Sequence, residues 1–121
     1  MIRQRSVWLY AAAGVLAAAA GGTLTRTRVE AQARGKTVYD AHCTECHGTN
    51  GKGDGPSAAY LTPRPRDFST GSYKIRSTET GSVPTDDDLM RSVRQGLYGT
   101  AMPAWDRILS DAEIRDVVEY M

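Results

Sequence analysis

The sequence contains only two cysteines and two histidines, and all four lie within one short stretch. Cys43 and Cys46 are three residues apart, and His42 and His47 flank them. A structural zinc site requires four ligands in a tetrahedral arrangement, which side chains crowded on one loop do not supply. A disulfide across this spacing would be strained. A thioredoxin-like redox pair requires a βαβ pattern, and no such pattern follows the cysteines.

The sequence also lacks an excess of basic charge. Residues 1–33, expected to be a signal peptide or membrane anchor with a linker, contain four of the 15 basic residues and one of the 14 acidic ones; residues 34–121 keep 11 and 13, a net charge of −2. A nucleic-acid-binding domain carries a basic patch, so we expect no nucleic-acid partner. Residues 34–121 are expected to form one small domain with a modest core. A domain of this size usually needs additional stabilisation beyond its hydrophobic core.

Long apolar runs are absent except near the N-terminus. There, Arg3 and Arg5 precede an alanine-rich apolar run, which is typical of a secretory signal. Residues 31–33 and residues 18–20 each offer a small-residue cleavage site. Without cleavage, residues 6–24 are long and apolar enough to associate with a membrane as an anchor. Both alternatives predict a periplasmic protein, either soluble or anchored to the inner membrane.

Residues Cys43–His47 read C-x-x-C-H, the attachment signature of c-type haem. Two thiols at this spacing lie on one side of a turn, and each can form a thioether with one vinyl group of the same porphyrin. His47 is then held under the ring, where it can bind the iron. The motif occurs once, which predicts one covalent haem c. Export agrees with this prediction, because the thioethers are formed outside the cytoplasm.

The second axial ligand of the iron is predicted to be Met102. His42 is tied to the same side of the ring as Cys43, and Met90 and Met121 fall in predicted helices, where methionine usually fills the core. Met102 instead lies in a loop between two helices and is followed by a proline that stiffens the chain. A thioether ligand favours ferrous iron and raises the reduction potential.

The remaining pattern predicts an all-α fold of three to four helices wrapped around the haem, preceded by the apolar export or anchor helix. A first helix is expected over residues 35–42. Residues 48–84 are rich in glycine and proline and are expected to be loops, with one helical turn at 57–61. Helices are expected over 85–95 and from Ser110 to Met121, because each begins with a hydroxyl cap and carries an apolar face at helical spacing.

This order of elements, with C-x-x-C-H near the start and Met102–Pro103 before the last helix, resembles a class I c-type cytochrome over residues 35–121. Within that class, residues 48–56 and 99–105 are similar to bacterial monohaem domains found in or beside respiratory complexes. The resemblance implies that the first and last helices cross. The residues expected at the crossing are Gly35, Tyr39 and Tyr120.

The resemblance also implies that a proline carbonyl accepts a hydrogen bond from His47; Pro63 is preferred, with Pro65 as the alternative. Trp105 is expected to pack on the haem or to bond one of its propionates. Other candidate propionate donors, by residue type, are Arg64, Arg66, Tyr73, Lys74 and Arg76, although each arginine is equally well explained as a solvated loop charge.

These features predict an electron-transfer protein rather than an enzyme: a one-electron carrier in a bacterial respiratory chain or oxidoreductase complex. The expected partners are redox proteins that dock transiently, or a membrane respiratory complex. An alternative is a haem domain with an open distal site, acting in gas sensing or peroxide chemistry. A further hypothesis is that the domain is the haem module of a larger enzyme or complex, and the abrupt end of the sequence at Met121 favours it.

Overall fold

The computed structural model describes residues 27–121. The chain divides into two units, Met1–Glu30 and Ala31–Met121, and the second unit contains the motifs described above. The predicted export segment, including residues 6–24, lies outside the described residues, and the division expected after residue 33 stays a prediction. Among residues 27–121, no helix has the length and apolar character needed to cross a membrane.

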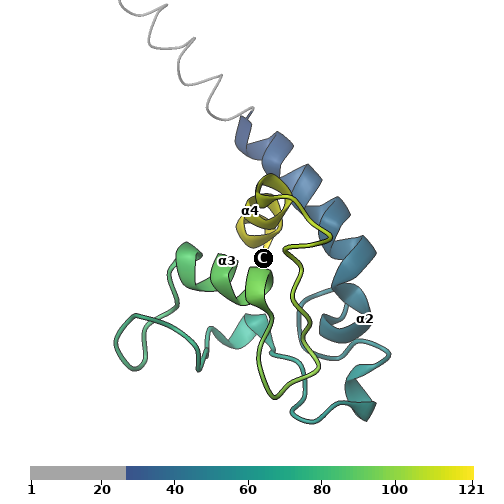
Figure 1. Ribbon diagram of the computed structural model, residues 1–121, viewed down its shortest axis with the longest axis vertical. Helices are drawn as coiled ribbons and strands as arrows, with labels where there is room; N and C mark the ends of the chain where they lie inside the picture. Colours follow the sequence, from purple (N-terminus) through teal and green to yellow (C-terminus); the bar gives the residue numbers. More distant parts are fainter. Residues whose placement is uncertain (1–26) are drawn as a thin grey trace, which may run out of the picture. The chain divides into compact units, whose positions relative to one another are not determined.

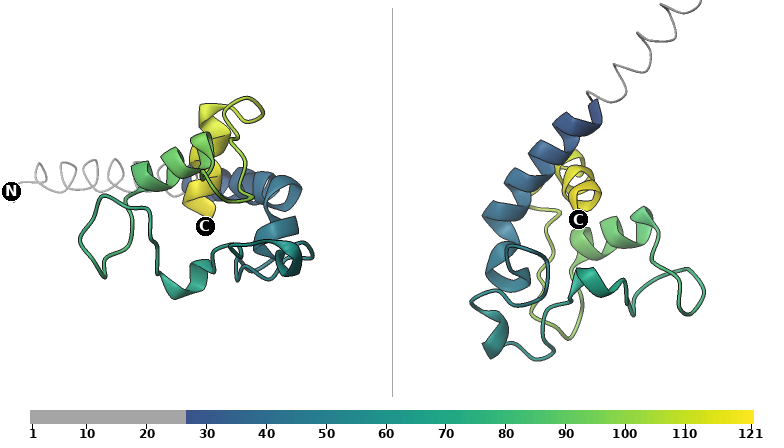
Figure 2. Two further views of the ribbon diagram at one scale, coloured as in Figure 1. Left: turned by 60° about the horizontal axis from the view of Figure 1, so that its bottom comes forward. Right: turned by 180° about the vertical axis from the view of Figure 1, so that it is seen from behind.

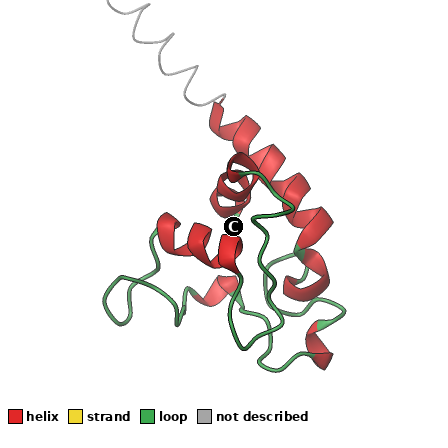
Figure 3. Ribbon diagram, viewed as in Figure 1, coloured by secondary structure: helices red, strands yellow, loops and turns green. Residues whose placement is uncertain are grey.

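The described chain is all-helical and contains no strand, which confirms the predicted fold class (Figures 1 and 3). The chain is already helical at residue 27, where the description starts, ahead of the expected start at 35, and residues 31–42 form the first helix of the second unit. The further elements are α2 (Thr44–His47), the 3₁₀ turns η1 (Ala58–Tyr60) and η2 (Phe68–Thr70), α3 (Asp86–Gln95) and α4 (Asp111–Tyr120). The turn η2 has no counterpart in the sequence-based expectations.

Helix 31–42 crosses α4 at Gly35, as the family resemblance implied (Figures 1 and 2). A Cβ atom at Gly35 would lie 2.0 Å from the carbonyl oxygen of Asp116 and 2.8 Å from Cβ of Tyr120. The aromatic rings of Tyr39 and Tyr120 pack beside this point, with their centroids 5.5 Å apart. Only a residue without a side chain allows the two backbones to approach this closely.

The core lies between helix 31–42, α3 and α4. Ile114 and Val117, two positions of the expected apolar face of α4, are 0% and 1% exposed. They pack with Val118 of the same helix and with buried residues from the other two helices and the loop before α4, namely Val38, Tyr39, Val93 and Leu109. Both predicted caps are present, because Thr85 and Asp88 form a capping box at α3 and Ser110 and Glu113 form one at α4.

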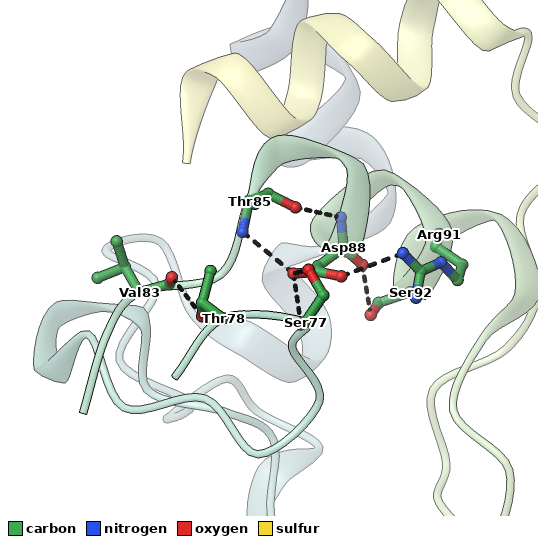
Figure 4. Close-up of polar contacts among 7 residues, drawn as sticks. All are labelled: Ser77, Thr78, Val83, Thr85, Asp88, Arg91 and Ser92. Carbon is green, nitrogen blue, oxygen red and sulfur yellow. Dashed lines mark hydrogen bonds and ion pairs between the residues drawn. The ribbon is translucent and has the colours of Figure 1, made fainter. Parts of the chain in front are cut away.

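Asp88 has a second role that its capping position did not reveal (Figure 4). Its side chain is 1% exposed. Oδ2 accepts hydrogen bonds from the backbone N–H and hydroxyl of Ser77, at 2.8 and 2.9 Å, and from the N–H of Thr85 at 3.2 Å. Oδ1 accepts from Arg91 at 3.1 Å. These donors, the Ser77 N–H foremost, hold the pKa of the Asp88 carboxyl far below its usual range, and they fix the loop before α3 to the helix.

Replacement of Gly35 by alanine is expected to destabilise the fold by about 1–3 kcal/mol, because the added methyl group overlaps the backbone of α4. The measurement is thermal unfolding of the haem-loaded protein. Gln32→Ala is the matched control, since residue 32 is exposed in the same helix and should change stability by less than ~0.5 kcal/mol. Equal stability of the two variants would contradict the crossing.

Asp88→Asn is expected to lower the melting temperature at pH 7 by roughly 5 °C or more, whereas Asp87→Asn, at an exposed position of the same turn, should change it little. The stability contributed by a carboxyl with a depressed pKa is present above its ordinary pKa of about 3.9 and is lost as the pH falls toward the folded-state pKa. The gap between wild type and Asp88→Asn should therefore narrow below about pH 4. A gap that widens on acidification would refute this role of Asp88.

Candidate functional site

A cleft of about 270 Å³ opens within the Ala31–Met121 unit. It is far larger than the ~30 Å³ that one water molecule occupies, so it is not a packing defect. Its walls come from α2, the loops after it, α3, the loop between α3 and α4, and α4. The six residues expected to bind the cofactor all line this cleft: Cys43, Cys46, His47, Pro63, Met102 and Trp105.

The two cysteines are positioned where helix 31–42 gives way to α2. The N–H of Cys43 still bonds to the carbonyl of Tyr39 at 2.9 Å, and the carbonyl of Cys43 then accepts from Cys46 and His47 at 3.2 and 2.9 Å. Both cysteines are half-buried free thiols. Burial, with a smaller contribution from Cys46, raises the pKa of Cys43 to about 11. Cys43 is therefore a neutral thiol at neutral pH.

Tyr39 links the helix crossing to the end of the motif. Its buried hydroxyl donates a hydrogen bond to the carbonyl of Gly48 at 2.8 Å, and burial is the main cause that raises the pKa of Tyr39 to about 12. Gly48 has φ +75°, a conformation that favours glycine, and this lets the chain turn back. The N–H of Gly53 then bonds to the carbonyl of His47 at 2.9 Å. The backbone on both sides of the imidazole is thus anchored.

The His47 ring is held by two contacts from one segment. Its Nδ1 lies 3.2 Å from the carbonyl oxygen of Arg66, and the ring stacks on Phe68 with centroids 4.5 Å apart. Burial lowers the pKa of His47, and the hydrogen bond to Arg66 opposes this effect. A neutral imidazole that donates from Nδ1 keeps a lone pair on Nε2, the arrangement a metal-ligating histidine requires.

The prediction that a proline carbonyl accepts the hydrogen bond from His47 is wrong. The acceptor is the carbonyl of Arg66, and neither Pro63 nor Pro65 supplies it. A Cβ at Gly53 would lie 2.4 Å from the carbonyl oxygen of Pro65, so this carbonyl packs against Gly53. The next carbonyl along the chain then reaches His47. Pro63 and Pro65 line the cleft instead. No side-chain pattern marks a backbone acceptor, so the sequence could indicate the segment but not the residue.

Met102 lies in a loop whose backbone is pinned. Its carbonyl accepts from the N–H of Leu97 at 3.1 Å, and its N–H donates to the hydroxyl of Thr100 at 3.1 Å. A Cβ at Gly96 would lie 2.7 Å from the carbonyl oxygen of Met102, so the end of α3 packs directly against this loop. The thioether is therefore presented at the cleft from a fixed backbone.

Two further residues line the cleft that were not among the expected cofactor-binding residues, Met121 and His42. Met121 was expected to fill the core, but it is 39% exposed and lines the cleft, so two thioethers border the same space. Met90 packs against the core, as expected. His42 also lines the cleft, and its ring lies 5.3 Å from the ring of Trp105. The contact that Trp105 makes with the cofactor stays a prediction.

The structure separates the candidate propionate donors into two groups. Those that line the cleft are Arg64, Arg66, Tyr73, Lys74 and Trp105. Arg76 does not line it, because its guanidinium donates to the backbone carbonyls of Tyr73 and Glu79.

The donor set fits a covalently attached haem. Two free thiols at C-x-x-C spacing, an imidazole with an available nitrogen and a thioether surround a largely apolar cleft. Thiols can carry the covalent bonds, whereas imidazole and thioether are the axial ligands that c-type iron prefers. Together with the all-helical fold and the helix crossing at Gly35, this site defines a class I c-type cytochrome domain.

Comparison with known proteins agrees. Residues 30–121 match the family model for cytochrome c oxidase, cbb3-type, subunit III, and the chain belongs to this family. Over 95 residues it is 30% identical to the cbb3-type cytochrome c oxidase subunit CcoP of Azospirillum brasilense, covering 78% of this chain and 29% of that protein. The corresponding subunit of Azospirillum sp. (strain B510) is 34% identical over 95 residues, covering 74% and 27%.

A solved structure gives the same picture. A chain of the Kuenenia stuttgartiensis reducing HAO-like protein complex superposes with a TM-score of 0.68 at 39% identity, covering 72% of this chain and 39% of that one. The chain spans less than a third of the length of the two curated relatives. It is a cytochrome c domain, a class of electron-carrying haem modules.

Single replacement of Cys43 or Cys46 by alanine is expected to leave haem held through one thioether, and the double variant should hold none covalently. Haem that stays with the polypeptide after denaturation, measured by pyridine haemochrome spectra and intact mass, reports this number. Ser57→Ala, outside the cleft, is the control for expression and should retain both bonds. Full covalent haem in the double variant would refute the attachment site.

Proposed function

We propose that this domain is a one-electron carrier that holds a single haem c through Cys43 and Cys46, with His47 and Met102 as axial ligands. The observation that carries the proposal is the convergence of both thiols, an oriented imidazole and a pinned methionine loop on one apolar cleft. When bound, the haem supplies a one-electron iron couple, and the protein sets its potential and its exposure.

The chain's own contribution begins at His47. The Arg66 carbonyl and the Phe68 ring restrict the imidazole to one orientation. The hydrogen bond that Nδ1 donates also makes the other ring nitrogen, Nε2, a more basic ligand. His47 and Met102, each held on a fixed backbone, would bind the iron of a bound haem in both oxidation states, and the reorganisation on electron transfer would then be small. Such a site needs no substrate and makes or breaks no substrate bond.

Met102 is favoured over Met121 as the second ligand because of its backbone. Leu97 and Thr100 hold the Met102 backbone at both its carbonyl and its N–H, whereas Met121 follows the last turn of α4 and is exposed. A side chain on a backbone that is already fixed loses less conformational entropy when it binds. Ligation by methionine stabilises the reduced iron and raises the potential.

The relatives indicate where such a carrier would act. Two of them are named as subunits of a cbb3-type cytochrome c oxidase. This similarity supports the proposal that the domain works as part of a membrane oxidoreductase or as a carrier that docks with one, and the N-terminal export pattern supports a periplasmic location. Residues 6–24 would supply a membrane anchor if they are retained.

Met102→Ala is expected to keep covalent haem but to lose the iron–sulfur charge-transfer band and to bind carbon monoxide readily. Met121→Ala is the matched control, because it removes the other thioether at the cleft. This variant should retain the charge-transfer band and should not bind carbon monoxide. Absorption spectra of both oxidation states, with and without carbon monoxide, give the result.

Three outcomes would change the assignment. The reverse behaviour of the two variants would make Met121 the ligand. Ready carbon monoxide binding by the wild type would mean an open distal site, and gas sensing or peroxide chemistry would replace electron transfer. A wild type without covalent haem would overturn the proposal as a whole.

A further inference from the structure

We propose that Asp88 and Arg76 are positioning residues that hold residues 73–75 in place as one wall of the cleft, and that this wall limits the access of water to the haem. This inference rests on the proposed function, because it concerns the surroundings of the same cofactor. Neither Asp88 nor Arg76 lines the cleft. Both act through residues 73–75, which we call the wall segment.

No regular structure supports the wall segment. Its three residues, Tyr73, Lys74 and Ile75, all line the cleft. They lie between η2 and α3, and within the described chain none of them takes part in a backbone–backbone hydrogen bond. The Tyr73 ring stacks on Phe68 with centroids 6.3 Å apart, which holds only the end near η2. Ile75, at the other end, is 53% exposed, so the core does not anchor it.

Asp88 holds the chain just after the wall segment (Figure 4). Its buried carboxylate accepts hydrogen bonds from the N–H and the hydroxyl of Ser77, at 2.8 and 2.9 Å. The capping box of α3 does not need these bonds, because it consists of Thr85 and Asp88 only. Ser77 follows Ile75 closely in the sequence, and Asp88 directly precedes Leu89, which lines the cleft from α3. The carboxylate thus joins two walls of the same cleft.

Arg76 provides a second attachment. Its guanidinium donates hydrogen bonds to two backbone carbonyls, that of Tyr73 and, from Nε at 3.1 Å, that of Glu79. It therefore connects the start of the wall segment to the loop beyond Ser77. A planar group with several donors in fixed directions is suited to such a bridge. The bonds of Arg76 close a turn, and the bonds of Asp88 attach this turn to α3.

A fixed wall has a consequence for the iron couple. Ferric haem carries one more positive charge than ferrous haem, and a charge is more costly in surroundings that exclude water. A wall segment that stays in place therefore favours the ferrous form and raises the reduction potential. A wall segment that is released admits water and lowers the potential.

The test is the reduction potential of the haem-loaded Asp88→Asn variant at neutral pH, measured against the wild type by equilibration with a reference redox dye. The substitution removes a negative charge, and this change alone would disfavour ferric iron and raise the potential. Release of the wall segment acts in the opposite direction. We expect release to prevail and to shift the equilibrium about threefold or more toward the ferric form.

Asp87→Asn is the matched control, because it removes the same charge from an exposed position of the same turn. It should leave the potential unchanged or slightly raised. Ser77→Ala removes one donor to Asp88 without a change of charge, and it should lower the potential by a smaller factor than Asp88→Asn. Ser77→Thr keeps both donors and should retain the wild-type potential.

Amide hydrogen exchange separates release of the wall segment from a general loss of stability. The N–H of Ile114, in the core of α4, reports global unfolding. In Asp88→Asn, exchange at the N–H of Ser77 should accelerate by a larger factor than exchange at Ile114, because the substitution acts directly on its acceptor.

The proposal is overturned if the potential of Asp88→Asn equals or exceeds that of Asp87→Asn, or if Ser77→Ala leaves the potential unchanged. Exchange at Ser77 that accelerates no more than exchange at Ile114 would also overturn it. Loss of the iron–sulfur charge-transfer band in Asp88→Asn would assign the effect to the distal ligand and count against the wall segment. These results are distinct from failure of the proposed function, which absence of covalent haem from the wild type would reveal.

Discussion

The hydrogen bond between His47 Nδ1 and the Arg66 carbonyl is the interaction on which the arrangement of the site depends. It connects two segments that the motif alone does not relate, the short helix α2 and the loop that follows η1. The contact requires the Gly48 turn and the close packing of the Pro65 carbonyl on Gly53. Nε2 can bind a metal only when the imidazole is neutral; burial favours the neutral form by lowering the pKa of His47, and this effect is opposed by the hydrogen bond to Arg66. Without it, two fixed sulfurs would still leave the orientation of the imidazole undefined.

The helix crossing at Gly35 gives this local arrangement a rigid support. Tyr39 belongs to both, because its ring packs on Tyr120 and its hydroxyl bonds to the carbonyl of Gly48. A displacement of α4 against helix 31–42 would therefore be transmitted to the residue that directly follows His47. The core of this small domain and the geometry of its ligand thus share side chains, and neither can be altered alone.

Much of the fold was predictable because its determinants are local. Capping boxes at Thr85 and Ser110, and an apolar stripe at helical spacing, act within one or two turns and leave clear patterns. The predictions failed where a contact joins distant segments through the backbone. The true acceptor for His47 is such a contact, and so is the burial of Asp88 against Ser77. Residue type gives no information about which carbonyl or N–H a folded loop will present.

The use of a backbone carbonyl to orient His47 has an evolutionary consequence. Every amino acid carries that group, so the side chain at position 66 is free to vary without loss of the bond to the imidazole. Sequence variation among relatives at this position will therefore record only the demands placed on the side chain. The orientation of the His47 imidazole depends on the path of the main chain, so an alignment of side-chain identities will not reveal it.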